Sequence, residues 1–326
     1  MSRELSMSAA IREVLEKILR ENPEAFLIGE DIAVYGGAFK TTRGFIDEFG
    51  AERIVDTPIS EAGIVSVACG AALMGSKPIV EIMFMDFMAL SFDGIINIAV
   101  KWQEIYGDDY KMPVIIRSPA GAGRSYGPTH SQSFEGLLQN VPKLIIICPS
   151  NAADAAGLML GAYQQDRPVI FIEHKALYAR KADCPDSFEA IEIGKARKVR
   201  EGDDITLIAY GRQVPVAIEA AEILEEKGIA VDLIDLRTVK PLDEEMILQS
   251  IEKTGRGISL EESPVIGGIG SEISALIMEK RFDYLEAPFS RLGAAEQAIP
   301  CNPKLETECF PEVDEIVAKA IELTNY

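Results

Sequence analysis

The strongest constraint on this chain is a repeated alternation of short β-branched runs with helical patterns. Between residues 25 and 174 the helical patterns begin near Glu61, Phe87 and Asn151, and the runs between them are AFLIGED, RIVDTP, KPIVEIMF, PVIIRSP, LIIICPS and PVIFIEH. Strands that alternate with helices are typical of βαβ units, which build a parallel sheet. The runs are almost continuously apolar, which predicts strands that are buried on both faces.

A second alternation of the same kind follows an irregular stretch. Residues 175–203 lose the rhythm and are predicted to form an irregular connection, after which ITLIAYG, AVDLIDLR and GISLEES again alternate with helical patterns. At 326 residues the chain is too long for one ordinary hydrophobic core. We therefore predict an α/β fold of two domains, residues 1–190 and 191–326, each with a mostly parallel sheet and helices on both faces.

The charge balance excludes several classes of function. With 52 acidic and 32 basic residues the net charge is -20, and such a surface repels nucleic-acid backbones and anionic membrane surfaces. A basic protein partner is favoured instead. The five cysteines include no CxxC pair and are interpreted as reduced thiols, and the N-terminal residues lack the apolar segment of a secretory signal, so we expect a cytoplasmic protein.

Two acidic positions at predicted element ends are candidates for chemistry. Ser60 is the expected N-cap of an apolar helix, which places Glu61 in the first turn, where a carboxylate complements the helix dipole. The same helix is rich in small residues and is expected to be closely packed and buried, where a carboxylate is costly without a partner. Glu30 ends the strand LIGED. Either a functional or a purely structural role fits these residues taken alone.

Histidine and phenylalanine supply the other candidates. His130 lies in GPTHSQS, a loop just after a predicted strand, and such loops form the ligand crevice of parallel sheets. A structural, hydrogen-bonded histidine is the alternative there, and it is the favoured interpretation for His174. Phe87 lies in EIMFMDFMALSF, where an aromatic face could stack on a heterocycle or simply fill the core.

Together the motifs resemble a known family, the beta subunits of the thiamine-diphosphate-dependent pyruvate, branched-chain 2-oxo acid and acetoin dehydrogenases. The resemblance extends almost from end to end. It is carried by LIGED, GGAFKTTRGF, RIVDTPISEAG, PIVEIMFMDF, GPTHSQSFE, VPKLIIICPSNAADAAGL, DLRTVKPLDEE and SIEKTGR. The implied fold is a transketolase-like pyrimidine-binding domain followed by a transketolase C-terminal domain.

The resemblance also implies roles for the candidate residues. Glu61 would hydrogen-bond the pyrimidine ring nitrogen of thiamine diphosphate and so help to activate the cofactor. Phe87 would stack on the pyrimidine, Glu30 would line the cofactor site, and His130 would face the substrate and the incoming lipoyl group. The implied activity is oxidative decarboxylation of a 2-oxo acid, or acetoin cleavage, followed by reductive acylation of a lipoyl domain.

The implied partners complete the active site. An alpha subunit would hold magnesium and the diphosphate, in an assembly of two alpha and two beta subunits, and a lipoyl acyltransferase core would accept the acyl group. Family members often bind a monovalent cation near an acidic turn. That turn reads YQQDRP here, with Gln165 and Arg167 at the expected positions, so we assign no metal to this chain.

Three alternatives remain open at this point. A self-sufficient transketolase-like enzyme would carry a GDG motif followed by Asn, and the GDD sequences at Gly107 and Gly202 do not match it. The glycine-rich GGIGSE could serve a dinucleotide-binding oxidoreductase, although it lacks the full fingerprint. A scaffolding subunit without catalysis is the third, and the presence of Glu61 and His130 speaks against it.

Overall fold

The computed structural model describes residues 3–107 and 109–326, which divide into two compact units. Unit 1 extends to Ala120 and resumes over Asn140–Ile193, and unit 2 comprises Gly121–Gln139 and Gly194–Tyr326. The division at residues 190 and 191 stays a prediction about domains. The compact units depart from it over residues 121–139, which the prediction assigned to the first domain and which pack with unit 2.

The sheet of unit 1 is parallel, with its strands in the order β6-β7-β5-β4-β2-β3. The strands are β2 (Ala25–Gly29), β3 (Ile54–Asp56), β4 (Lys77–Glu81), β5 (Ile115–Ala120), β6 (Ile145–Ile147) and β7 (Val169–His174). All residues of β5, β6 and β7 are buried. The predicted burial of strands on both faces is therefore confirmed for these three.

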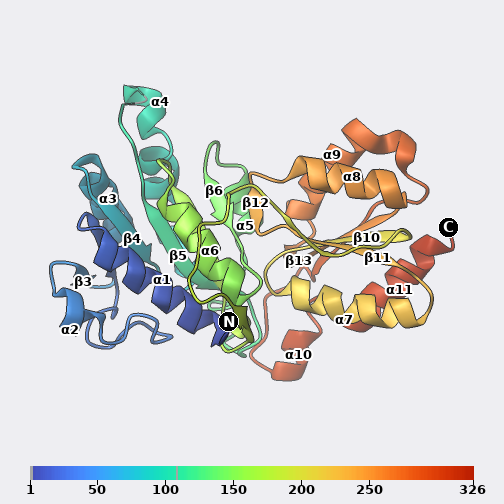
Figure 1. The fold of residues 1–326 in the computed structure, drawn as a ribbon, viewed down its shortest axis with the longest axis horizontal. Helices are drawn as coiled ribbons and strands as arrows, with labels where there is room; N and C mark the ends of the chain where they lie inside the picture. The colour runs from blue at the N-terminus through green and yellow to red at the C-terminus, as the bar shows by residue number, and fades with distance from the viewer. Residues whose placement is uncertain (1–2, 108) are drawn as a thin grey trace. The chain divides into compact units, whose positions relative to one another are not determined.

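Helices cover both faces of this sheet. On one face α1 (Met7–Glu21) and α6 (Ala152–Tyr163) lie side by side and share a core with Ile79, Ile115 and Val169 of the strands (Figure 1). The strand residues between these point to the opposite face of the sheet. On that face α3 (Glu61–Leu73) packs on β4. Unit 1 also contains α2 (Phe45–Phe49), the 3-10 helices η1 (Met85–Ser91) and η3 (Lys175–Leu177), the π-helix η2 (Gly94–Ala99) and α4 (Trp102–Tyr106).

Unit 2 repeats this architecture on a five-stranded sheet of order β14-β13-β10-β11-β9. Helices α7 and α11 pack on one face, and α8 and α9 lie on the other, where hydroxyl groups of α8 hydrogen-bond Thr206 of β10 (Figure 1). The elements are β9 (Arg197–Arg200), β10 (Ile205–Ala209), β11 (Val231–Asp235), β12 (Thr238–Lys240), β13 (Gly257–Pro264), β14 (Ser290–Ala294), α5 (Glu135–Gln139), α7 (Gln213–Glu226), α8 (Glu244–Thr254), α9 (Ile269–Arg281), η4 (Phe282–Tyr284), α10 (Pro303–Thr307) and α11 (Val313–Thr324).

The prediction of an irregular connection over residues 175–203 is wrong in part. Strand β8 (Lys181–Cys184) pairs antiparallel with β1 (Arg3–Ser6), and β9 pairs antiparallel with β11 at the edge of the second sheet. Both β8 and β9 carry charged residues and no apolar run, as edge strands commonly do, so their sequences give little strand signal. Within the described residues, no helix is long and apolar enough to cross a membrane.

Candidate functional site

Glu61 begins helix α3, as the sequence predicted. It is buried, with 5% of its surface exposed, and it occupies the first turn, where the helix dipole favours a carboxylate. Ser60 is the N-cap residue, but its side chain donates to the Pro58 carbonyl and makes no capping bond. No residue in the described part of the chain donates a hydrogen bond to the Glu61 carboxylate. A buried carboxylate in this position can accept a hydrogen bond from a ligand.

Glu30 lies beside this helix start. It follows β2 directly, is 7% exposed, and its Oε1 accepts a hydrogen bond of 3.2 Å from the backbone N–H of Ser60. Burial raises the pKa of Glu30, the nearby Glu61 carboxylate raises it further, and the Ser60 N–H offsets part of that effect. The fold therefore brings Glu30 and Glu61 together as an interacting pair of carboxyl groups.

Phe87 belongs to the same part of unit 1, and a helical segment begins near it, at Met85, as the sequence predicted. It lies inside the short helix η1, which packs against α3. Its ring is half-buried and meets Phe84 edge-to-face with the ring centroids 6.0 Å apart, and Phe84 meets Phe39 in the same way at 5.9 Å. The aromatic run thus supplies one partly accessible ring close to the helix that begins at Glu61.

The expectation that α3 is a buried helix holds for one side of it only. One side of the helix packs on unit 1 through Ile64, Val65, Ala68 and Cys69, whereas Val67 on the opposite side is 59% exposed. The exposed side also contains Ala62, Gly63, Ser66 and Gly70. Because small and apolar residues surround the helix, its sequence has no amphipathic signal that indicates which side the chain itself covers.

His130 lies on the segment 121–139, which packs with unit 2, whereas Glu30, Glu61 and Phe87 belong to unit 1. The imidazole is half-buried, and its Nδ1 lies 3.0 Å from the Thr129 hydroxyl. His174 instead ends β7, and its Nδ1 accepts a hydrogen bond from Ala176 N. That contact supports the structural interpretation of His174, which stays a prediction.

The sequence analysis missed an ion network that links three adjacent strands in unit 1. Arg117 of β5 donates from Nε and Nη2 to the two carboxylate oxygens of Glu173 of β7, each at 2.7 Å, and also to Glu81 of β4. Tyr178 donates to Glu173 at 2.6 Å. All four side chains are buried. A charged residue inside each apolar run was the available signal, because a buried charge requires a partner.

The glycine-rich GGIGSE is explained by an internal carboxylate. Glu261 of β13 accepts hydrogen bonds from the backbone N–H groups of Ile269 and Gly270 at the start of α9, at 2.8 and 3.1 Å. A side chain at Gly268 would collide with the same carboxylate, at 2.5 Å. Glu261 thus occupies the place where a dinucleotide phosphate would bind, which removes the basis for that alternative.

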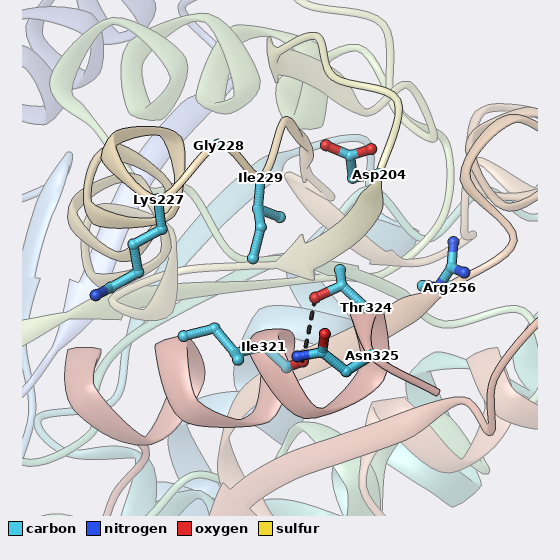
Figure 2. Close-up of a pocket in the computed structure, with 8 residues that line it drawn as sticks. All are labelled: Asp204, Lys227, Gly228, Ile229, Arg256, Ile321, Thr324 and Asn325. Carbon is cyan, nitrogen blue, oxygen red and sulfur yellow. Dashed lines mark hydrogen bonds between the residues drawn. The ribbon is translucent and has the colours of Figure 1, made fainter.

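Unit 2 has a surface groove that is separate from the predicted site residues. Figure 2 shows it between the end of α11, with Ile321, Thr324 and Asn325, and the turn after α7, with Lys227 and Gly228. None of the four predicted site residues lines it. Among the described residues there is no group of three or more His, Cys, Asp or Glu side chains arranged to hold a metal ion.

Comparison with known proteins identifies the family. Residues 3–181 match the transketolase pyrimidine-binding domain, and residues 194–316 match the transketolase C-terminal domain. The chain is 41% identical to the beta subunit of acetoin:2,6-dichlorophenolindophenol oxidoreductase from Bacillus subtilis, covering 99% of this chain and 98% of that one. This chain belongs to the family of E1 beta subunits of pyruvate and acetoin dehydrogenases. The resemblance inferred from the motifs is confirmed.

Other relatives agree with this assignment. The E1 beta subunit of pyruvate dehydrogenase from Rickettsia conorii is 36% identical, with 99% of each chain covered, and the mitochondrial one from Dictyostelium discoideum is 38% identical. Among solved structures, a split-gene transketolase described as an inactive beta4 tetramer superposes with a TM-score of 0.80 at 24% identity over 98% of both chains. A transketolase mutant from Pichia stipitis superposes with a TM-score of 0.70 at 15% identity, but over only 46% of its length. These structures confirm the two-domain α/β fold.

Proposed function

We propose that this chain supplies the pyrimidine half of a thiamine-diphosphate site in the E1 component of a 2-oxo acid or acetoin dehydrogenase. The observation that carries this proposal is the carboxyl pair at the start of α3. Glu61 is buried, receives no hydrogen bond from described residues, and lies beside Glu30, whose pKa is raised. A buried carboxyl group of this kind can form a hydrogen bond with a ring nitrogen of a ligand.

Each residue of unit 1 has a separate role in the proposal. Glu61 hydrogen-bonds the pyrimidine nitrogen, and Glu30 limits the negative charge of the pair because its own raised pKa favours the neutral form. Phe87 presents a partly exposed ring for stacking on the pyrimidine. The cofactor, when bound, supplies the carbanion chemistry that cleaves the bond next to the oxo group.

His130 is proposed for a later step. It faces the substrate and the lipoyl group and exchanges a proton during reductive acylation, a task suited to an imidazole near neutral pH. Its place on a loop after a parallel strand supports this proposal, because catalytic residues are often held on such loops.

An alpha subunit completes the site in this proposal, in an assembly of two alpha and two beta chains that serves a lipoyl acyltransferase core. The chain spans 46% of the length of the Pichia transketolase chain, and no described acidic or histidine cluster suits a metal ion. The magnesium ion and the diphosphate are therefore assigned to the alpha subunit. We propose a 2-oxo acid or acetoin as the substrate class.

The proposal is tested with Glu61→Ala in the assembled enzyme. We expect proton exchange at the thiazolium carbon of the cofactor, followed by NMR, and turnover with an artificial electron acceptor to fall together by about 100-fold or more. Glu52→Ala, at an exposed position of unit 1, is the matched control and should leave both unchanged. Assays of the wild-type enzyme with pyruvate, branched 2-oxo acids and acetoin identify the substrate. Near-normal proton exchange in Glu61→Ala would refute the cofactor assignment.

A further inference from the structure

The loop that precedes His130 has an unusual backbone. Every second residue from Gly121 to Gly127 has a positive φ, with values of 79° at Gly121, 85° at Gly123, 56° at Ser125 and 80° at Gly127. Ser125 is not a glycine, so the surrounding structure must hold it in this conformation. Alternation of this kind can turn successive N–H groups toward one side of the chain, where they form a concavity that binds an anion.

The anion in this concavity is a carboxylate of the same chain. Glu306 Oε1 accepts hydrogen bonds from Gly123 N and Ser125 N, both at 3.1 Å. Its Oε2 accepts from Ser125 N at 2.9 Å and from the Ser125 hydroxyl at 3.2 Å. Glu306 is 4% exposed. Hydrogen bonds to a carboxylate are about twice as strong as those between neutral groups, so Glu306 anchors residues 123–125 strongly. A second carboxylate, Glu262, accepts from Ala122 N at 2.5 Å.

The segment that carries Glu306 is itself well fixed. Asn302 caps the one-turn helix α10 by accepting from Lys304 N and Leu305 N, and Pro303 begins the helix. The same segment makes two further contacts with the loop. Its Phe310 and Cys309 side chains form an apolar cluster with Ala122. Its Cys301 side chain lies so close to Gly127 that a Cβ atom there would collide with the sulfur.

His130 follows directly after these anchored residues. Its backbone N–H donates to the Gly127 carbonyl at 3.3 Å, and the base of the loop is closed by Gly121 N, which donates to the Gln132 carbonyl at 3.2 Å. The position of His130 therefore depends on where residues 121–127 are held. The imidazole has only the short span from Gly127 to Gln132 in which to adjust.

We propose that Glu306 is a positioning residue for His130, acting through the backbone of residues 123–125. This inference rests on the proposed function of His130 in reductive acylation. A displacement of about 1 Å at a reacting group can cost about 100-fold in rate. Loss of the Glu306 charge should therefore slow the step that uses His130 and leave untouched the step that uses Glu61.

The test compares three variants of the assembled enzyme. Glu306→Gln has nearly the same shape but loses the charge and points an amide donor at the loop's N–H groups. We expect it to slow acylation of a lipoyl domain by about 10- to 100-fold while proton exchange at the cofactor thiazolium carbon stays normal. Glu306→Asp keeps the charge and should recover part of the rate. Glu308→Gln removes the same charge from an exposed position two residues away and should have no effect.

Two further measurements separate positioning from general destabilisation. Hydrogen exchange measured by mass spectrometry should rise over residues 121–134 in Glu306→Gln and stay unchanged over β2 and α3. In a His130→Ala background, Glu306→Gln should slow acylation no further, because a positioning residue acts only through the group that it places. Unchanged exchange over residues 121–134, or an equal loss of rate in both backgrounds, would overturn the inference. If His130→Ala itself acylates at the wild-type rate, the proposed function of His130 fails, and hydrogen exchange still decides whether Glu306 orders the loop.

Discussion

Replacing Arg117 with methionine tests how strongly the buried ion network holds unit 1 together. The guanidinium is 1% exposed, and it forms ion pairs with the buried carboxylates of Glu81 and Glu173. Methionine keeps much of the side-chain volume but leaves both carboxylates buried without a counter-ion. Removal of one partner from a buried ion pair costs about 3–5 kcal/mol, a large share of the roughly 5–15 kcal/mol that stabilises a domain. We expect a loss of that size in the free energy of unfolding at pH 8.

The loss should depend on pH in a defined direction. Burial raises the pKa of Glu81, Arg117 lowers it and Glu173 raises it again, and the net result is a raised value. A carboxyl with a raised folded-state pKa contributes stability that is fully present below its unfolded pKa and is lost as pH rises through its folded pKa. Without Arg117 the pKa of Glu81 rises further. At low pH the Glu81 carboxyl is then protonated, which removes the cost of burying its unpaired charge. The deficit should be smaller at pH 5 than at pH 8.

Urea unfolding of the purified chain, followed by circular dichroism and tryptophan fluorescence, measures both effects. Lys111→Met is the control, because it removes the surface ion pair with Asp166, whose partners are 62% and 49% exposed, and should cost no more than about 1 kcal/mol. If Arg117→Met costs no more than Lys111→Met at pH 8, or if its deficit does not shrink at pH 5, the buried network does not stabilise unit 1 in the way described.

Three other predictions concern titration, cofactor and partner. Burial, aided by Glu262 and Glu261, raises the pKa of Glu135 from 4.5 to about 8, so its contribution to stability should decline as pH rises through that window. In Glu135→Gln the free energy of unfolding in urea should fall less steeply with pH. An unchanged dependence on pH would contradict the raised pKa of Glu135. Calorimetry with magnesium and thiamine diphosphate should show weak or no binding by this chain alone and tight binding after an alpha subunit is added; tight binding by the chain alone would contradict the half-site proposal. The net charge of -20 predicts that the association rate with a basic subunit-binding module of an acyltransferase falls as ionic strength rises. A rate independent of salt would rule out electrostatic steering.

Several features of the site were predictable because their signals are local. The strand and helix periodicities follow from which side chains face a core, and they indicated the parallel sheet of unit 1 and the start of α3 at Glu61. Glu30 could be placed at a strand end for the same reason. The roles of Glu61, Glu30, Phe87 and His130 came from the family resemblance, and these roles stay predictions until the variants are measured.

Features made by residues far apart in sequence were decided only by the tertiary structure. Strands β8 and β9 take their hydrogen bonds from distant partners, and their own residues carry no apolar pattern. Side-chain exposure on α3 depends on what packs against it, which a uniformly apolar helix does not encode. The carboxylate of Glu306 and the backbone of Ser125 lie 181 residues apart in the chain and meet only after folding. The periodicity of a sequence indicates whether a residue faces a core. The partner of a buried charge depends on which distant residues the tertiary structure brings beside it.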